Sequence, residues 1–197
     1  MDINAEKVKE LREKTGIGMM KCKEALIACE GDFGKAIDYL RKKGLATAEK
    51  KSARTTNEGR IAGYIHTTNK VGVLVELNCE SDFVAKGDEF AQLGKDICMQ
   101  VAASRPIAVA REDVPQATIG REKEIYAEQV KGKPANIIDK IVEGKLNAFF
   151  KEVCLLEQPF IKDPAISIQD LIKSKIAKFG ENITVRRFVR YQLGEET

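Results

Sequence analysis

The stretch VGVLVELNCESDFVAK, residues 71–86, changes its periodicity halfway along. Its first half alternates apolar residues with small or polar ones, which is typical of a strand with one buried face. The residues on that face are Val71, Val73, Val75 and Leu77. From Asp82 the apolar residues recur at helical spacing as far as Pro106. They are Phe83, Phe90, Leu93, Ile97 and Val101. The stretch therefore predicts a strand that leads directly into a helix.

The segments around this stretch predict an α+β fold. Residues 60–67 and 71–78 flank a Thr-Asn-Lys turn and read as a hairpin, and residues 182–193 read as a later strand. Further helices are expected over 118–130, over 134–158 with Pro134 in the first turn, and over 168–180 with Ser167 as the cap. Pro159 and Pro164 mark an irregular loop. Two strands alone are barely stable, so we expect a small antiparallel sheet packed on helices.

The first 45 residues predict a separate bundle of three short helices. The TGIG break at 15–18 separates the first two helices, Asp32 is the expected N-cap of the third, and Gly44 is its expected end. So small a core is marginal alone, and we expect one face of it, with Met19 and Met20 as candidates, to meet another molecule. The predicted organisation is a helical domain at 1–45, a basic linker at 46–58 and an α+β domain at 59–197.

The junction residues Asp82 and Phe83 allow two interpretations. Residues in the first turn of a helix have few neighbours on their N-terminal side, so these two side chains could project from the fold and contact a partner. Alternatively, Phe83 simply begins the apolar face of the helix. The residues alone favour the second interpretation.

Composition excludes several classes of protein. The chain is 43% hydrophobic and 32% charged, and no apolar run approaches the ~20 residues of a membrane span. The N-terminus lacks the features of a secretion signal, so we expect a cytoplasmic protein. Five cysteines at irregular spacing with one histidine argue against a zinc site, and Cys22 and Cys29 are expected to be buried as reduced thiols. A net charge of +3 with 6% aromatic residues and no tryptophan argues against nucleic-acid binding.

No set of residues suggests catalysis. The single histidine, His66, falls within a predicted strand and has no neighbouring nucleophile, so a structural role is expected. The sequence contains no phosphate-binding loop, dinucleotide-binding glycine pattern or zinc-protease motif. The residues by themselves therefore predict a binding protein, with no cofactor, no metal and no small-molecule substrate of its own.

Two segments resemble the signature regions of the elongation factor Ts family: residues 8–26, VKELREKTGIGMMKCKEAL, and residues 78–86, NCESDFVAK. The resemblance continues in the same order through AIDYLRKKG, KIVEGKL, QPFIKDP and ITVRRFVRYQLGE, so it covers nearly the whole chain. It implies a ubiquitin-associated-like helical domain at the N-terminus and an α+β core. It also implies a guanine-nucleotide exchange factor for elongation factor Tu, a protein that performs no covalent chemistry.

The resemblance also implies roles for individual residues. Phe83 would insert between two helices of the partner's nucleotide domain, and Asp82 would disturb the region that supports Mg²⁺. The family motif TDFV is here Ser81, Asp82, Phe83 and Val84, and the serine keeps a capping hydroxyl. Contacts that hold the partner are implied for Arg12, Met19, Met20 and Lys51.

The chain has room for one of the two similar subdomains found in the core of long family members. By similarity to other short members, we expect a homodimer in which the second subunit supplies the missing half. The alternative to exchange activity is a docking or chaperone protein that binds the same partner without releasing nucleotide.

Overall fold

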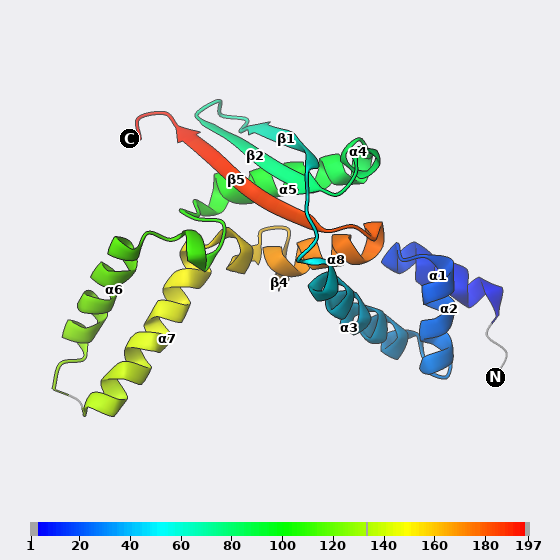
Figure 1. Ribbon diagram of the computed structural model, residues 1–197, viewed down its shortest axis with the longest axis horizontal. Helices are drawn as coiled ribbons and strands as arrows, with labels where there is room; N and C mark the ends of the chain where they lie inside the picture. Colours follow the sequence, from blue (N-terminus) through cyan, green and yellow to red (C-terminus); the bar gives the residue numbers. More distant parts are fainter. Residues whose placement is uncertain (1–3, 133, 196–197) are drawn as a thin grey trace. The chain divides into compact units, whose positions relative to one another are not determined.

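The computed structural model describes residues 4–132 and 134–195 (Figure 1). The chain forms two compact units, and each combines segments that are distant in sequence. The first unit contains the residues up to Gly59 together with Asn78–Gly87 and Asp170–Thr184, and the second contains Arg60–Leu77, Asp88–Gln169 and the residues from Val185. The domain boundaries expected from the sequence remain a prediction.

The second unit is built on a three-stranded sheet (Figure 1). Its strands are β1 (Glu58–Ile65), β2 (Val71–Cys79) and β5 (Ile183–Gln192), in the order β1-β2-β5. The backbone amide of Leu193 donates to the carbonyl of Lys70 over 2.9 Å, so the end of β5 lies beside the start of β2. The expected hairpin and late strand are therefore confirmed, and the chain has the α+β architecture predicted from its sequence.

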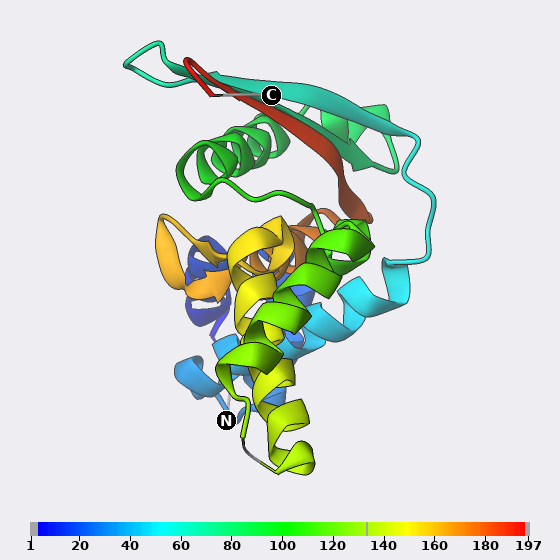
Figure 2. The same cartoon turned by 90° about the vertical axis from the view of Figure 1, so that its left-hand side faces the viewer.

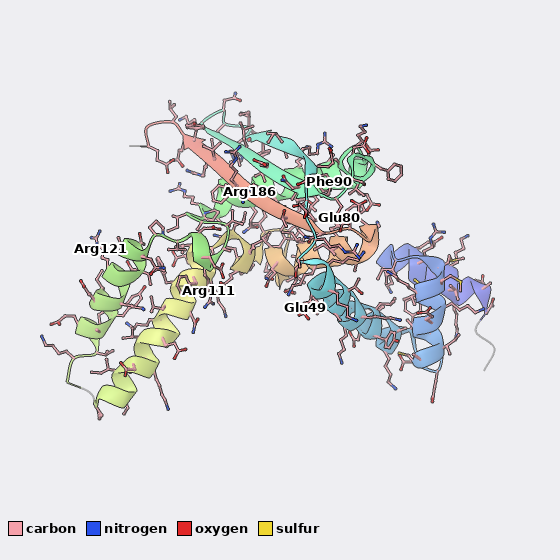
Figure 3. All side chains as sticks on the ribbon, in the orientation of Figure 1. Glu49, Glu80, Phe90, Arg111, Arg121 and Arg186 are labelled. Atoms are coloured by element: carbon pink, nitrogen blue, oxygen red, sulfur yellow. The ribbon has the colours of Figure 1, made fainter. Side chains whose placement is uncertain are left out.

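One face of the sheet packs on helix α5 (Asp88–Ser104), which lies against it in Figure 2. A Cβ built on Gly94 would lie 2.8 Å from the Cβ of Ala62, so a glycine is what lets α5 approach β1 this closely. The buried residues of the helix recur at its own period. They include Phe90, Leu93, Ile97 and Val101, with Phe90 labelled in Figure 3. Val73, Val75 and Leu77 of β2 are buried as the alternation predicts.

The prediction of a single helix from Asp82 is wrong, because this part of the chain forms two helices. A short helix, α4 (Asp82–Ala85), ends before α5 begins at Asp88. The amide of Gly87 donates to the carbonyl of Val84 over 3.0 Å and closes the short turn. Two acidic residues, Asp88 and Glu89, then occupy the first turn of α5, where negative charge complements the helix dipole.

Helices α6 (Gln116–Gln129) and α7 (Ala135–Val153) form a hairpin, and they lie side by side in Figures 1 and 2. Pro134 is the N-cap of α7, one position before the first turn in which it was expected, and the helix ends at Val153, earlier than the expected 158. Arg111, labelled in Figure 3, belongs to the short 3-10 helix η1 (Arg111–Asp113) at the base of the hairpin. Its guanidinium donates to both carboxylate oxygens of Glu157 and to Asn147 Oδ1, the latter over 2.8 Å. The same group lies 4.7 Å from the centre of the Phe150 ring. These contacts tie the hairpin to the chain that follows it.

The segment around Pro159 and Pro164, expected to be an irregular loop, is instead a small hairpin. Strands β3 (Pro159–Phe160) and β4 (Asp163–Ser167) pair antiparallel after the 3-10 helix η2 (Leu155–Glu157). Both prolines lie within strands of this two-stranded sheet, where an edge position tolerates a missing amide donor. Helix α8 (Ile168–Phe179) follows directly after Ser167 and is closed by Gly180, which has a φ of 77°.

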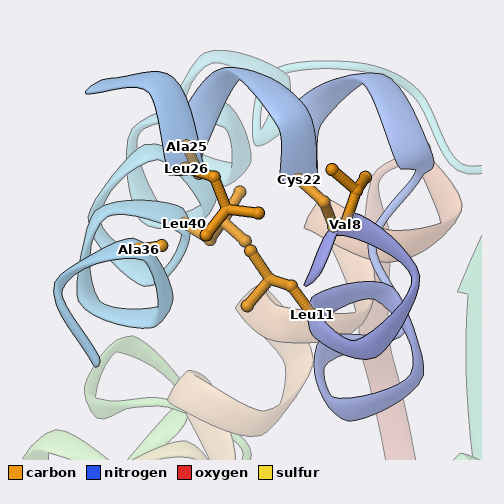
Figure 4. Packing of buried hydrophobic residues seen from close by; sticks show 7 residues of the cluster. All are labelled: Val8, Leu11, Cys22, Ala25, Leu26, Ala36 and Leu40. Atoms are coloured by element: carbon orange, nitrogen blue, oxygen red, sulfur yellow. The ribbon is translucent and has the colours of Figure 1, made fainter. Parts of the chain in front are cut away.

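The first unit contains the three N-terminal helices α1 (Ala5–Thr15), α2 (Met19–Ala28) and α3 (Phe33–Lys51). Asp32 caps α3 through a bond from the amide of Lys35 over 2.9 Å, as predicted, and Gly16 ends α1 with a φ of 67°. The helices enclose one small core (Figure 4). Its buried residues are Val8, Leu11, Cys22, Ala25, Leu26, Ala36 and Leu40.

Helix α3 is longer than predicted, because Gly44 does not end it. A Cβ built on Gly44 would lie 3.0 Å from the Cβ of Ala177 in α8. The glycine therefore permits close packing of two helices, and α3 continues to Lys51 through the first residues of the expected linker. No helix in the described part of the chain is long and apolar enough to cross a membrane.

The reactivity of the five cysteine thiols tests how the chain buries them. Cys22, Cys79, Cys98 and Cys154 are buried, and Cys29 is half-buried. Burial raises the pKa of Cys98 and of Cys154 to about 11, and the thiolate is the reactive form. With a disulfide reagent at pH ~8, below the raised thiol pKa values, we expect Cys29 alone to react rapidly in the native protein. All five thiols should react after denaturation, and fast native reaction at more than one site would contradict the packing.

Candidate functional site

The Ser81–Val84 segment presents an exposed aromatic ring on a fixed turn. Ser81 is the N-cap of α4, and its hydroxyl accepts from the amide of Val84 over 3.4 Å. Val84 and Ala85 are buried and anchor the turn, whereas the side chain of Phe83 is 84% exposed. The interpretation of Phe83 as the beginning of a core face is therefore wrong. The break at Gly87 separates this ring from the buried face of α5.

Asp82 lies beside the exposed ring and forms an ion pair with Lys86. Its carboxylate is 2.7 Å from the ammonium nitrogen one helical turn later. The hydrogen bond from Lys86, and then its positive charge, lowers the pKa of Asp82. Asp82 is thus a carboxylate at neutral pH. Both side chains are largely exposed, so the pair can exchange its partner at little cost.

A second exposed surface lies at the junction of α1 and α2. Arg12 is exposed in the last turn of α1, and Met19 and Met20 are 43% and 70% exposed at the start of α2. Both methionines are thus accessible to another molecule, and the contact itself remains a prediction. We call Arg12, Met19 and Met20 the grip surface. Thioether side chains are adaptable and are common at binding surfaces.

Ile27 extends this surface and was missed by the sequence analysis. It follows Met20 by seven residues in α2, which places the two on the same side of the helix. Its side chain is 58% exposed. The signal was present as an apolar residue off the buried stripe of Cys22, Ala25 and Leu26, but a lone apolar residue on a helix surface is common.

The structure places Lys51 differently from the other predicted contacts. Its ammonium group donates to the backbone carbonyl of Gly180, at the C-terminal end of α8. A cation at this end of a helix is stabilised by the free carbonyls and the dipole. Lys51 is half-buried in that position. Any contact between Lys51 and a partner would therefore have to coexist with this internal bond or replace it.

The turn that carries Phe83 also depends on residues that sequence reasoning did not identify. The carboxylate of Glu181 accepts from both the backbone amide and the hydroxyl of Ser81, over 3.0 and 2.6 Å. The two residues are 100 positions apart, and neither belongs to a periodic pattern that would connect them. Local sequence patterns therefore gave no signal for this contact.

Across 4–132 and 134–195 there is no group of three or more His, Cys, Asp or Glu side chains that could hold a metal ion. His66 is exposed and forms a hydrogen bond over 2.9 Å with the hydroxyl of Tyr64. The first unit instead combines an exposed phenylalanine, two exposed methionines and an arginine, which are residue types enriched at protein interfaces. An exposed surface of this composition is typical of a factor that binds another protein.

Comparison with known proteins assigns the chain to a family. A family model described as Elongation factor TS matches residues 5–195. The elongation factor Ts of Thermodesulfovibrio yellowstonii is 63% identical over 196 residues, covering 99% of this chain and 98% of that protein. The elongation factor Ts of Fervidobacterium nodosum is 58% identical over 197 residues, with coverage of 99% and 100%. The chain therefore belongs to the elongation factor Ts family, a family of translation elongation factors.

Proposed function

We propose that this protein is the guanine-nucleotide exchange factor for elongation factor Tu and that Phe83 acts as a wedge in the partner's nucleotide domain. The observation that supports the proposal most directly is the 84% exposure of Phe83 on a short helix. This helix is capped by Ser81 and anchored by the buried residues Val84 and Ala85. Leaving a phenyl ring in water has a free-energy cost of about 2 kcal/mol relative to burying it. A protein that binds a partner through that ring recovers this free energy in the complex.

An exchange factor need not touch the nucleotide. A GTP-binding protein holds GDP through a phosphate-binding loop, a base pocket and Mg²⁺, which bridges the phosphates and the switch regions. The factor needs only to bind more tightly to the conformation that holds GDP and Mg²⁺ poorly. Linkage then requires GDP to weaken binding of the factor by the same ratio. The proposed complex is therefore tightest with nucleotide-free elongation factor Tu.

The exposed residues of the first unit divide naturally into two roles. Asp82 and Phe83 would act on the Mg²⁺ region and between two helices of the partner, while Ser81 and Val84 hold the turn that carries them. The grip surface would hold the partner during this step, together with any contribution from Lys51. On this basis, the grip surface governs affinity and the wedge governs the rate of release.

The test of the proposal is catalysis of GDP release. Elongation factor Tu loaded with a fluorescent GDP analogue is mixed with excess GDP and with this protein at a tenth of the concentration of elongation factor Tu or less. Complete and accelerated release at that ratio is expected, because an exchange factor turns over. Formation of a complex without accelerated release would show a docking or chaperone protein instead.

We also propose that the protein is a homodimer formed through the open face of the sheet. Ile61 and Ile65 of β1, Leu74 of β2, and Val189 and Tyr191 of β5 are all exposed. Cβ atoms built on Gly63 and Gly72 would lie 3.2 and 3.1 Å from the side chains of Leu74 and Ile65, which puts these residues of β1 and β2 on one face.

Arg187 of β5 joins the same face through an ion pair with Glu76 of β2, with 2.7 Å between Arg187 Nε and Glu76 Oε2. Because side chains alternate along a strand, Val189 and Tyr191 lie on the Arg187 side of β5. A largely apolar sheet face of this kind can pack on the same face of a second copy in a twofold interface.

An acidic substitution on this face should separate the dimer. Tyr191→Asp places a charge within the proposed interface, where it would lose its hydration, and we expect light scattering to change from the dimer mass to the 21.9 kDa monomer. The matched control is Ile125→Asp, at an exposed isoleucine of α6, which should leave the mass unchanged. A wild-type protein that is monomeric at micromolar concentration would refute the interface.

The protein acts in the cytoplasm, where its partner and its reduced cysteines both belong. The helical domain at 1–45, the linker at 46–58 and the α+β domain at 59–197 remain the proposed division of the chain.

A further inference from the structure

The segment Gly180–Asn182 connects α8 to β5. It holds Ser81, at the start of the turn that carries Phe83, through charge-assisted hydrogen bonds. Both carboxylate oxygens of Glu181 accept from Ser81, one from its amide over 3.0 Å and one from its hydroxyl over 2.6 Å. Two hydrogen bonds from one residue to one carboxylate fix orientation as well as distance. The Cys79 thiol adds a bond to the Ser81 carbonyl over 3.1 Å.

The turn needs this support because it is too short to be stable alone. Helix α4 has four residues, and a single helical turn gains too few hydrogen bonds to offset the cost of its formation. The hydroxyl of Ser81 donates to Glu181, so its oxygen is oriented to accept from the amide of Val84. The carboxylate of Glu181 thus fixes both the backbone of Ser81 and the hydroxyl with which Ser81 caps α4.

The neighbouring residues join this turn to the end of α3. The backbone amide of Asn182 donates to Glu80 Oε1 over 2.6 Å, and its side-chain amide donates to the carbonyls of Ser52 and Arg54 over 3.2 and 2.8 Å. Asn182 is 2% exposed, so these bonds are protected from water. Figure 3 labels Glu80, which also contacts Arg54. The ammonium group of Lys51 adds a further bond between α3 and this segment, because it donates to the carbonyl of Gly180.

We infer that Glu181 is a positioning residue for nucleotide exchange, which acts by holding the Ser81 turn so that Phe83 is presented to the partner in one orientation. This inference rests on the proposed function and deepens it. A ring that is 84% exposed has few side-chain contacts to orient it, so its direction is set by the backbone beneath it. A wedge on a loose turn still binds, but it samples the productive geometry less often.

The inference predicts a separation between maximal rate and affinity. Glu181→Ala should lower the maximal rate of GDP release by about tenfold, the effect of losing a charge-assisted pair of bonds. The concentration for half-maximal release should stay within about twofold, because the grip surface is intact. Glu181→Gln should lie between the wild type and Glu181→Ala, since its amide oxygen can still accept one bond.

Two comparison variants separate positioning from a general loss of structure. Met20→Ala should show the opposite behaviour, with a higher half-maximal concentration and an unchanged maximal rate. Glu49→Ala removes an exposed carboxylate of α3 that has no bond to the turn, and it should change neither quantity. Melting curves followed by circular dichroism establish that each variant is folded at the assay temperature.

A fluorescence measurement tests the same inference without the partner. The chain contains no tryptophan, so Phe83→Trp introduces a single reporter at the turn. Adding Glu181→Ala to Phe83→Trp should lower the tryptophan anisotropy, because the turn gains mobility. Unchanged anisotropy, or a Glu181→Ala variant with the wild-type maximal rate, would overturn the inference. If wild-type protein fails to accelerate release, the proposed function fails, and the anisotropy still decides whether Glu181 orders the turn.

Discussion

Phe83→Ala should slow the maximal rate of GDP release from elongation factor Tu by about thirtyfold to about a thousandfold, with the protein still folded. A buried aromatic anchor at an interface contributes about 2–4 kcal/mol, and each ~1.4 kcal/mol changes a rate tenfold. The ring is 84% exposed in the free protein, so its removal leaves no cavity and frees no internal partner. The rate is measured by displacement of a fluorescent GDP analogue over a range of concentrations of the variant.

The control for this prediction is another exposed apolar side chain outside the first unit. Ile125 of α6 is 40% exposed, and Ile125→Ala should release GDP at the wild-type rate. Binding of Phe83→Ala to elongation factor Tu should persist, because the grip surface is unchanged. Wild-type exchange by Phe83→Ala would remove the wedge from the mechanism, even if the protein proves to be an exchange factor.

Phe90→Ala should have the opposite consequence, a large loss of stability. Phe90 is 0% exposed, and it packs in α5 with Leu93 and Ile97. Truncation of a fully buried phenylalanine lowers the free energy of unfolding by about 3–5 kcal/mol, through lost burial and the cavity that remains. For a chain of this size we expect the midpoint of thermal unfolding to fall by roughly 10 °C.

The same substitution seven residues earlier is the matched control. Phe83→Ala should change the free energy of unfolding by less than about 0.5 kcal/mol, as exposed substitutions do. Urea unfolding of the two variants, followed by circular dichroism, measures the difference directly. Comparable destabilisation by Phe83→Ala would mean that its ring is buried in solution, and this outcome would contradict the proposed site.

These two phenylalanines illustrate what periodicity can predict. The spacing of Phe90, Leu93, Ile97 and Val101 identified the buried face of α5, and the alternation of Val73, Val75 and Leu77 identified the buried face of β2. Both patterns are local, because a helix and a strand repeat their exposure every few residues. Phe83 fits the helical pattern equally well, and the pattern alone placed it in the core.

The glycines show that helix ends cannot be predicted from the position of a glycine alone. Gly16, Gly44, Gly87 and Gly180 all lie where a helix was expected to end or to continue. Gly16 and Gly180 end helices with positive φ, as predicted, but Gly44 lies inside α3 against Ala177, and Gly87 interrupts a helix that was expected to be continuous. A glycine permits a turn and a close approach equally, and its neighbours in space determine which occurs.

Sequence alone was sufficient for the α+β class, the three N-terminal helices, the hairpin and the family, because these depend on local periodicity and on long motifs in order. Tertiary structure was needed to show that Phe83 is exposed, that Glu181 holds Ser81 from 100 residues away, and that Lys51 bonds to Gly180. Those features are contacts between segments that no repeat or spacing connects. Their geometry exists only once the chain has folded.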